Sequence, residues 1–231
     1  MARLLLIGNS RWHWAEQDPD TRALRCWHTS PAAAFPEEGT ALLAWAAVGA
    51  QPQPPPPASA RRIRLEDVPL QGAPPWLGLD RALVGWRAWQ QQGAAVLVAD
   101  AGTALSLTRV NGEGCFSGGL ISAGLALQLQ ALTGATAQLP PVDFAVAASC
   151  ADAWPHQTQA AMAEGCRRAV AAAIVQAWKQ LCSDDESPKA GLWLTGGDAA
   201  LLLPLLQEQQ LDPVMAPDLA LEAMAALPVV G

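Results

Sequence analysis

The chain has 231 residues, 51% of them apolar and 15% charged, which supplies ample material for a packed core and excludes a disordered protein. Its formal net charge of −7 argues against a protein that binds nucleic acid or anionic membranes. The two lysines, Lys179 and Lys189, do not follow glycine-rich turns, so a Walker-type phosphate loop is excluded. No apolar run approaches the roughly 18 residues of a membrane span. Dispersed cysteines and a short first apolar run predict a cytoplasmic protein.

Two short apolar strands end in the same kind of turn. Residues 4–7 lead into Gly8-Asn9-Ser10, and residues 96–99 lead into Asp100-Ala101-Gly102-Thr103. Each turn is followed by a second strand-like segment. The repeat indicates an internal duplication, with two unrelated hairpins as the alternative.

The remaining elements alternate between helices and strands. Residues 51–57 are rich in proline and predict a stiff surface connection, with a partner-binding segment as the alternative. A helix is expected over residues 79–92, closed by Gly93. The second half adds strands over 115–121 and 192–195 and helices over 124–132 and 160–181, followed by a leucine-rich helix. This alternation predicts an α/β fold.

Three glycine turns with a neighbouring hydroxyl follow strands. They contain Gly8-Asn9-Ser10, Gly102-Thr103 and Thr195-Gly196-Gly197. Glycine lets a phosphate approach backbone N–H groups closely, and hydroxyls add donors. The turns therefore indicate a phosphate cradle, although each alone is also an ordinary turn.

Two carboxylates are candidates for chemistry. Asp100 ends an apolar strand, where a carboxylate is costly unless it is paired or bound to a cation. Asp80 begins the expected helix, where a helix cap is the alternative interpretation. The adjacent Arg81 could bind a substrate carboxylate through a forked pair of hydrogen bonds, or pair with Asp80. The three histidines form no ligand or triad spacing and are interpreted as structural.

These residues together resemble the type III pantothenate kinases, within the superfamily of acetate and sugar kinases, Hsp70 and actin. Gly78-Leu79-Asp80-Arg81 resembles that family's Gly-Ala-Asp-Arg element, and Gly8-Asn9-Ser10 resembles its Asp-x-Gly-Asn-Thr loop. The matching segments are spread in order over nearly the whole chain. The others are Asp100-Ala101-Gly102-Thr103-Ala104, residues 118–124, residues 136–140, Thr158 with Ala161 and Gly165, and Thr195-Gly196-Gly197.

The resemblance implies two ribonuclease-H-like lobes, residues 1–92 and 93–231, in an actin-like ATPase fold with a nucleotide cleft between them. It implies that the protein phosphorylates pantothenate with ATP, the first step towards coenzyme A, as a homodimer. A divalent cation such as magnesium and a monovalent cation, potassium or ammonium, would be required. Asp80 would be the catalytic base, and Asp100 would bind the monovalent cation. Gly78, Leu79, Asp80, Arg81 and Thr158 would bind pantothenate, whereas Gly8, Asn9, Ser10 and Thr103 would bind ATP.

The sequence departs from the family pattern at identifiable positions. Leu6 stands where the family has an aspartate that serves the metal and phosphate group, and Gln71 stands where an aromatic substrate contact is expected. Two alternatives therefore stay open. One is a catalytically weak or inactive kinase-like protein that binds or regulates, and the other is a kinase for another small hydroxy acid or sugar.

Overall fold

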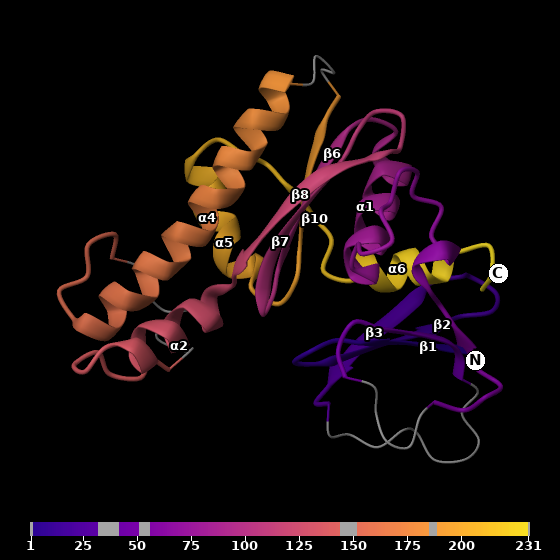
Figure 1. Ribbon diagram of the computed structural model, residues 1–231, viewed down its shortest axis with the longest axis horizontal. Coiled ribbons are helices and arrows are strands. Elements are labelled where there is room, and N and C mark those ends of the chain that lie inside the picture. Colours follow the sequence, from indigo (N-terminus) through magenta and orange to yellow (C-terminus); the bar gives the residue numbers. More distant parts are fainter. Residues whose placement is uncertain (1, 32–41, 51–55, 144–151, 185–188, 231) are drawn as a thin grey trace. The chain divides into compact units, whose positions relative to one another are not determined.

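The structure is a computed structural model that describes residues 2–31, 42–50, 56–143, 152–184 and 189–230 (Figure 1). Its contacts divide the chain into two compact units. The first unit comprises Met1–Gly93, Glu113–Phe116 and Asp218–Gly231, and the second comprises Ala94–Gly112 and Ser117–Pro217. Most of the proline-rich stretch at 51–57 lies outside the described residues.

The first unit is built on a five-stranded sheet in the order β3-β2-β1-β4-β5. The central strand β1 is antiparallel to β2 and parallel to β4. Alternating residues of β1 and β2 face a tryptophan-rich cluster that contains Trp12, Trp14 and Trp45, and Trp14 stacks on Trp27 at 6.1 Å. The elements of this unit are β1 (Ala2–Ile7), β2 (Trp12–Gln17), β3 (Leu24–Thr29), β4 (Leu42–Ala47), β5 (Arg61–Arg62), the 3-10 helix η1 (Leu65–Asp67), α1 (Leu79–Gln92) and α6 (Leu219–Ala226).

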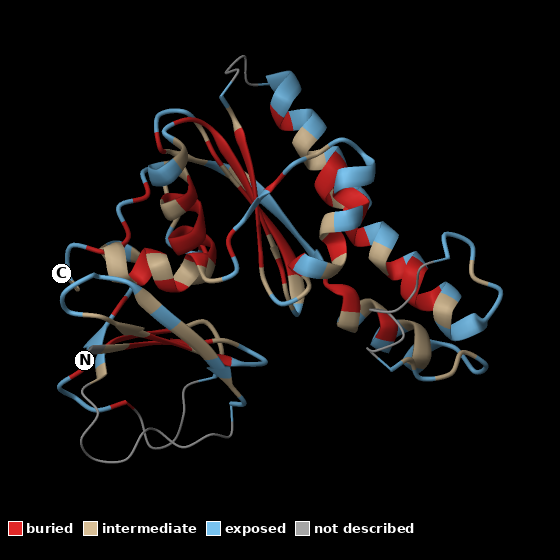
Figure 2. Ribbon diagram, turned by 180° about the vertical axis from the view of Figure 1, so that it is seen from behind, coloured by how far each residue is buried: buried red, intermediate tan, exposed pale blue. Residues whose placement is uncertain are grey.

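The second unit is built on a five-stranded sheet in the order β10-β9-β6-β7-β8. Its core lies between β6, β7 and β9 and the inward faces of α4 and α5, and buried residues follow the central strands in Figure 2. Leu105, Leu194, Ile174 and Leu202 are almost fully buried there. The elements are β6 (Val96–Ala101), β7 (Ala104–Val110), β8 (Phe116–Ala123), α2 (Leu125–Ala135), α4 (Thr158–Asp184), β9 (Gly191–Thr195), α5 (Ala199–Glu208) and β10 (Val214–Met215).

Both sheets share one topology. Counted along the chain, each has the spatial order third, second, first, fourth and fifth strand. In both, the first strand is antiparallel to the second and parallel to the fourth. The predicted repeat is therefore confirmed, and the alternative of two unrelated hairpins is wrong.

Two helices need a closer description. The leucine spacing after Gly124 indicates a buried helix, and α2 is buried on one side, because Leu125 and Leu129 face inward while Leu127, two residues from each, is 38% exposed. The division of the chain at residues 92 and 93 stays a prediction. The last helix, α6, packs on α1, β1 and β2 and so lies in the first unit, because its apolar side is buried against them.

Candidate active site

The start of α1 carries Asp80, the candidate base, and Arg81, the candidate carboxylate-binding residue. Gly78 is the N-cap, so Asp80 is the second helical residue and not the cap. Its Oδ1 accepts a hydrogen bond from the Arg81 backbone N–H at 2.9 Å, which satisfies one free amide of the first turn. The helix dipole favours a carboxylate at this end. Asp80 is partly exposed and is therefore accessible to a substrate.

Arg81 is unusually buried for a charged side chain. It is 8% exposed, and its guanidinium carbon lies 5.8 Å from the centre of the Phe116 ring. Burial lowers the pKa of Arg81, and the neighbouring Asp80 carboxylate opposes that shift. A guanidinium that has lost part of its water is suited to bind a carboxylate in a forked geometry.

A short strand segment from later in the chain forms the wall beside Arg81. Gln71 forms a parallel bridge with Cys115: the Gln71 N–H donates to the Gly114 carbonyl at 3.2 Å, and the Phe116 N–H donates to the Gln71 carbonyl at 2.8 Å. Gly114 has a φ of +82°, and a Cβ there would lie 2.7 Å from the Trp89 ring. The segment is therefore pressed against α1, and it fixes Phe116 over Arg81.

In the turn between β1 and β2, the backbone of Gly8 is in close contact with neighbouring backbone. The Gly8 N–H donates to the Arg11 carbonyl at 3.0 Å. A Cβ on Gly49, which follows β4, would lie 2.6 Å from the Gly8 carbonyl oxygen, so the two backbones are in close contact. Asn9 and Ser10 are exposed at the tip of the turn.

The second unit gathers the other glycines around Asp100. A Cβ on Gly196, whose φ is +93°, would lie 2.6 Å from Asp100 Oδ1 and would also collide with the Ala101 carbonyl. Gly124, the N-cap of α2, has its N–H bonded to the Thr103 carbonyl at 3.1 Å. A Cβ on Gly124 would collide with the Gly102 carbonyl oxygen. Asp100 therefore lies beside the third glycine turn, and Thr103 lies beside the N-terminus of α2.

The predicted pantothenate residues fall in different units. Gly78, Leu79, Asp80 and Arg81 are in the first unit, whereas Thr158, an exposed residue at the start of α4, is in the second. Phe116, Gly49 and Gly124 were not assigned to the site from the sequence. Of these three residues, only Gly124 had a signal in the sequence. It stands between the glycine-containing strand segment 115–121 and the helix that became α2.

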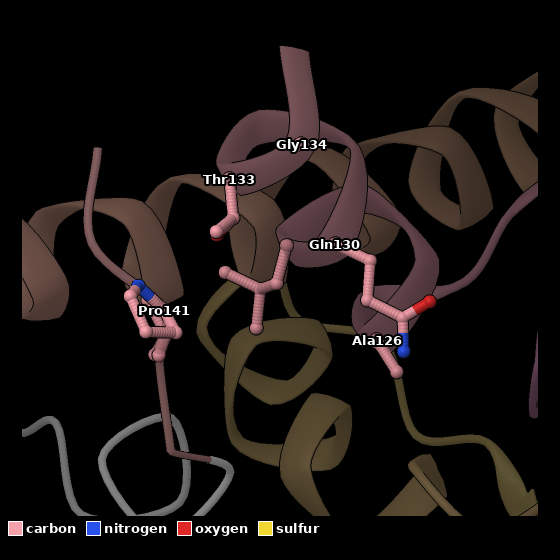
Figure 3. A pocket seen from close by; sticks show the side chains of 7 residues that line it. Ala126, Gln130, Thr133, Gly134 and Pro141 are labelled. Atoms are coloured by element: carbon pink, nitrogen blue, oxygen red, sulfur yellow. The ribbon is translucent and has the colours of Figure 1, made fainter. Parts of the chain in front are cut away.

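Two cavities lie away from these residues. A cavity of about 410 Å³ lies beside α2, and the side chains of Gln130 and Thr133 and the ring of Pro141 surround it in Figure 3. Another of about 430 Å³ in the first unit is lined by Arg22, Arg87 and Glu222 among others. None of the predicted site residues lines either cavity, so the glycine turns and the start of α1 remain the candidate site.

Neither metal clusters nor membrane helices occur in the described part of the chain. Within the described residues, no group of three histidine, cysteine, aspartate or glutamate side chains is arranged to hold a metal ion. In the same residues, no helix combines the length and the apolar character needed to cross a membrane.

Two α/β units with one topology, each with a glycine turn between its first two strands, define the actin-like ATPase and sugar kinase fold class. Solved structures agree. A Campylobacter jejuni protein from the Baf family matches with a TM-score of 0.60 at 17% identity, over 96% of this chain and 94% of that one. The (R)-2-hydroxyglutaryl-CoA dehydratase component A of Acidaminococcus fermentans matches with a TM-score of 0.56 at 10% identity, over 99% and 96%.

Sequence relatives then fix the family. The model of the family described as type III pantothenate kinase matches residues 58–180. A type III pantothenate kinase of Synechococcus sp. strain JA-3-3Ab is 36% identical over 95% of this chain and 89% of its own length. The chain belongs to the type III pantothenate kinase family.

Proposed function

We propose that the protein transfers the γ-phosphoryl group of ATP to the primary hydroxyl of pantothenate, which gives 4'-phosphopantothenate and ADP for coenzyme A synthesis. The observation that carries this proposal is the pairing of Asp80 with the desolvated Arg81 at the start of α1. Membership of the family indicates pantothenate as the substrate. The segment that matches the family model, residues 58–180, includes both Asp80 and Arg81.

Asp80 is the proposed catalytic base. Its carboxylate accepts the hydroxyl proton as the substrate oxygen bonds to phosphorus and the bond to the ADP oxygen breaks. Arg81 binds the pantothenate carboxylate, and Gly78, Leu79 and Thr158 complete the substrate contacts. Phosphoryl transfer depends mostly on positioning and charge neutralisation, so one oriented carboxylate and one fixed cation are appropriate groups.

ATP is proposed to bind through backbone donors and hydroxyls. In the first unit Gly8, Asn9 and Ser10 present the tight turn described above, and in the second unit Thr103 lies beside the N-terminus of α2. Close glycine backbones and helix N-termini both favour phosphate oxygens. This arrangement would replace the lysine of a Walker-type loop.

The two expected cations fit the described residues differently. Asp100 Oδ1 and the Ala101 carbonyl oxygen both face the space that a Cβ on Gly196 would fill, and these oxygens are proposed to bind the monovalent cation, potassium or ammonium. The divalent ion is not matched at position 6, because Leu6 is 5% exposed and offers no oxygen. We therefore assign no step to a divalent ion held by the first strand.

The protein is proposed to act as a homodimer in the cytoplasm. The edge strand β8 exposes Leu120 by 63% and Ile121 by 64%, which is consistent with a contact between copies. Its described cysteines are free thiols, as a reducing compartment favours. Sedimentation velocity gives the mass in solution, and a monomer at micromolar concentration would contradict the dimer.

A second candidate function is a weak or inactive kinase-like protein that binds or regulates. The buried Leu6 favours it, because that residue removes a carboxylate from the proposed phosphate site. A kinase for another small hydroxy acid is the further alternative. Turnover measured with pantothenate and with related hydroxy acids separates these hypotheses. A pantothenate kinase turns over pantothenate best, a kinase for another hydroxy acid turns over that acid best, and an inactive protein turns over none.

The test of the proposed function is ADP formation that depends on pantothenate and potassium. Asp80→Asn should lower kcat by about 10²- to 10⁴-fold with a similar KM, because the amide accepts no proton. Glu222→Gln, which alters another acid in the first turn of a helix, is the matched control and should keep its kcat. No turnover by the unaltered protein would contradict the kinase, whereas full activity of Asp80→Asn would contradict only the base.

A further inference from the structure

The cavity of about 430 Å³ in the first unit lies where three distant segments of the chain meet. These segments are the β2–β3 hairpin, α1 and α6, which all belong to the first unit, and α6 packs on both α1 and β2 (Figure 1). The volume falls in the range of roughly 300–1,000 Å³ that is typical of small-molecule sites. The lining residues are separate from those proposed to bind pantothenate and ATP.

Arg87 of α1 brings a cation to this cavity without a closely bound carboxylate. Its side chain is 25% exposed, and its Nη1 donates to Gln90 Oε1 at 2.6 Å. Among the described residues, its buried Nε has no hydrogen-bond acceptor. Glu222 Oε2 lies 3.9 Å from that Nε, beyond hydrogen-bond length, and accepts from Gln91 Nε2 at 3.0 Å. The exposed part of the Arg87 guanidinium is therefore suited to an added anion.

Arg22 brings a second cation to the same cavity from the turn between β2 and β3. Its φ of +62° is uncommon for a residue other than glycine. The turn is closed by its N–H, which donates to the Asp18 carbonyl at 3.0 Å, and its own carbonyl accepts from Gln17 Nε2 at 3.3 Å. The exposed Arg22 side chain thus extends from a fixed backbone position.

The charge and the apolar lining together define a class of ligand. The two guanidinium groups face the single carboxylate of Glu222, which leaves one positive charge in excess, in a chain whose net charge is −7. This excess suits a monoanion better than a doubly charged phosphate, which Glu222 would repel more strongly. Apolar side chains from β3 and α6 also line the cavity, namely Leu24, Ala225 and Ala226.

We propose that this cavity binds a small aliphatic carboxylate. Arg22 and Arg87 bind its carboxylate group, and its hydrocarbon chain lies against Leu24, Ala225 and Ala226. The proposal adds a second ligand site to the first unit, beyond the proposed pantothenate and ATP sites. Because the ligand contacts the hairpin, α1 and α6 at once, binding stabilises the folded chain.

Nuclear magnetic resonance of the full ¹⁵N-labelled protein tests the site, with butyrate as the probe. The amide signals of Leu24, Ala225 and Ala226 should shift and saturate as butyrate is added. Butyramide, which has nearly the same shape without the charge, should bind at least tenfold more weakly. Acetate, which lacks two methylene groups, should bind about fivefold more weakly or less tightly still, and inorganic phosphate should also bind more weakly than butyrate.

Variants of the two arginines separate their contributions. Arg87→Ala should weaken butyrate binding by about tenfold or more, and Arg87→Lys, which keeps the charge, should recover part of the affinity. Arg22→Gln should cause a smaller loss, because the side chain is exposed. The matched control is Arg25→Ala, which removes a guanidinium that lies 5.8 Å from the Trp27 ring and does not line the cavity, and it should change the affinity by less than about twofold.

The proposed pantothenate site also binds a carboxylate, so the two sites must be distinguished. Saturating pantothenate should leave the shift of Ala225 on addition of butyrate unchanged. The proposal is overturned if pantothenate abolishes that shift, if butyrate shifts residues 78–81 in place of Ala225, or if butyramide or phosphate binds as tightly as butyrate. A folded Arg87→Ala protein with unchanged affinity, or an equal loss in Arg25→Ala, would also overturn it. Because the titration needs no turnover, its result is independent of the proposed function.

Discussion

Arg81 depends on a residue from a distant part of the chain. The Phe116 ring lies 5.8 Å from its guanidinium carbon and is itself fixed by the backbone bonds to Gln71. A ring over a desolvated guanidinium both attracts and orients the charge. The orientation of the proposed carboxylate-binding group is therefore set by a side chain that does not belong to the Gly78-Leu79-Asp80-Arg81 motif.

Phe116→Leu should raise the KM for pantothenate about tenfold and leave kcat within about twofold, because the ring contact affects binding more than chemistry. Phe116→Tyr keeps the ring and should restore the KM. Steady-state kinetics measures both. In an Arg81→Ala background, Phe116→Leu should have no further effect.

The control is Trp27→Leu in β3, which removes a ring that lies 5.6 Å from the guanidinium carbon of Arg3 and 5.8 Å from that of Arg25, and not beside Arg81. Its KM should be unchanged even if its melting temperature falls. An equal rise in KM in both variants would attribute the effect to general destabilisation and not to Arg81.

His13 couples the stability of the chain to pH. Its pKa is lowered from 6.5 to about 4 in the folded state, chiefly by burial. Between these values the unfolded chain binds a proton that the folded chain does not, so this residue makes stability rise with pH from about 4 to 6.5 and adds no slope above. Urea unfolding at a series of pH values, followed by tryptophan fluorescence, should show this slope reduced in His13→Asn. Identical slopes in the two proteins would contradict the assignment.

Some site residues are evident from sequence and others are not. Asp100 can be singled out because a carboxylate at the end of an apolar strand is costly unless it is paired. Asp80 is singled out by the Gly78-Leu79-Asp80-Arg81 motif, because a carboxylate at a helix start is common by itself. Phe116 has no such signal, since it reaches Arg81 only through the bridge between Gln71 and Cys115.

At the scale of elements, α4 contains a charge cluster centred on a buried carboxylate. Glu164 is 3% exposed, and its carboxylate bonds to Arg167 at 2.6 and 2.8 Å and to Arg168 at 2.7 Å. The helix spacing of three and four residues brings both cations to one acid. Arg167 also donates to the Leu201 carbonyl of α5, so the cluster links the two helices.

Glu164→Gln should destabilise the protein by about 2 kcal/mol, because the partly buried Arg167 loses the charged partner that it meets inside the fold. Chemical denaturation measures the change. Glu66→Gln is the matched control, since its contact with Arg64 is 3.9 Å long and both side chains are largely exposed, so its effect should stay below about 1 kcal/mol. Similar losses in the two variants would show that burial does not determine the effect.

The elements differ in how well their patterns predict them. The helix over residues 79–92 coincides with α1, because Gly93 in a left-handed conformation ends it and an apolar face runs along it. Strand β4 was not predicted, since Leu42–Ala47 is a short apolar run that fits a buried helix as well as a strand. Strands β5 and β10 have two residues each, too few for any periodicity.

On the scale of the whole molecule, the contacts assign the last helix to the first unit. Met224 of α6 is fully buried there, whereas Met215 of β10 in the second unit is 38% exposed. No local pattern in the sequence reveals this assignment, because it depends on which apolar face a late helix meets. The division of a chain into units is therefore a tertiary property that strand and helix signals alone do not supply.

Met224→Ala should cost about 2–5 kcal/mol, the range for removing a buried side chain, whereas Met215→Ala should cost less than about 1 kcal/mol. Amide hydrogen exchange localises the effect. Faster exchange should occur in β1, β2 and α1, which share the first unit with α6, while β6 and β9 keep their protection. Uniform acceleration across both units would show that they unfold together and contradict this prediction.

The placement of α6 has a consequence for synthesis on the ribosome. Residues 94–217 contain the whole second unit, together with the short segment Glu113–Phe116 of the first unit that packs on Arg81 and Trp89, so the second unit is complete before the last helix has been translated. The first unit begins earliest yet lacks its covering helix until residues 218–231 emerge. Its apolar face around Leu4 stays uncovered in the meantime, and chaperones that shield nascent chains should engage this protein through its earliest strands.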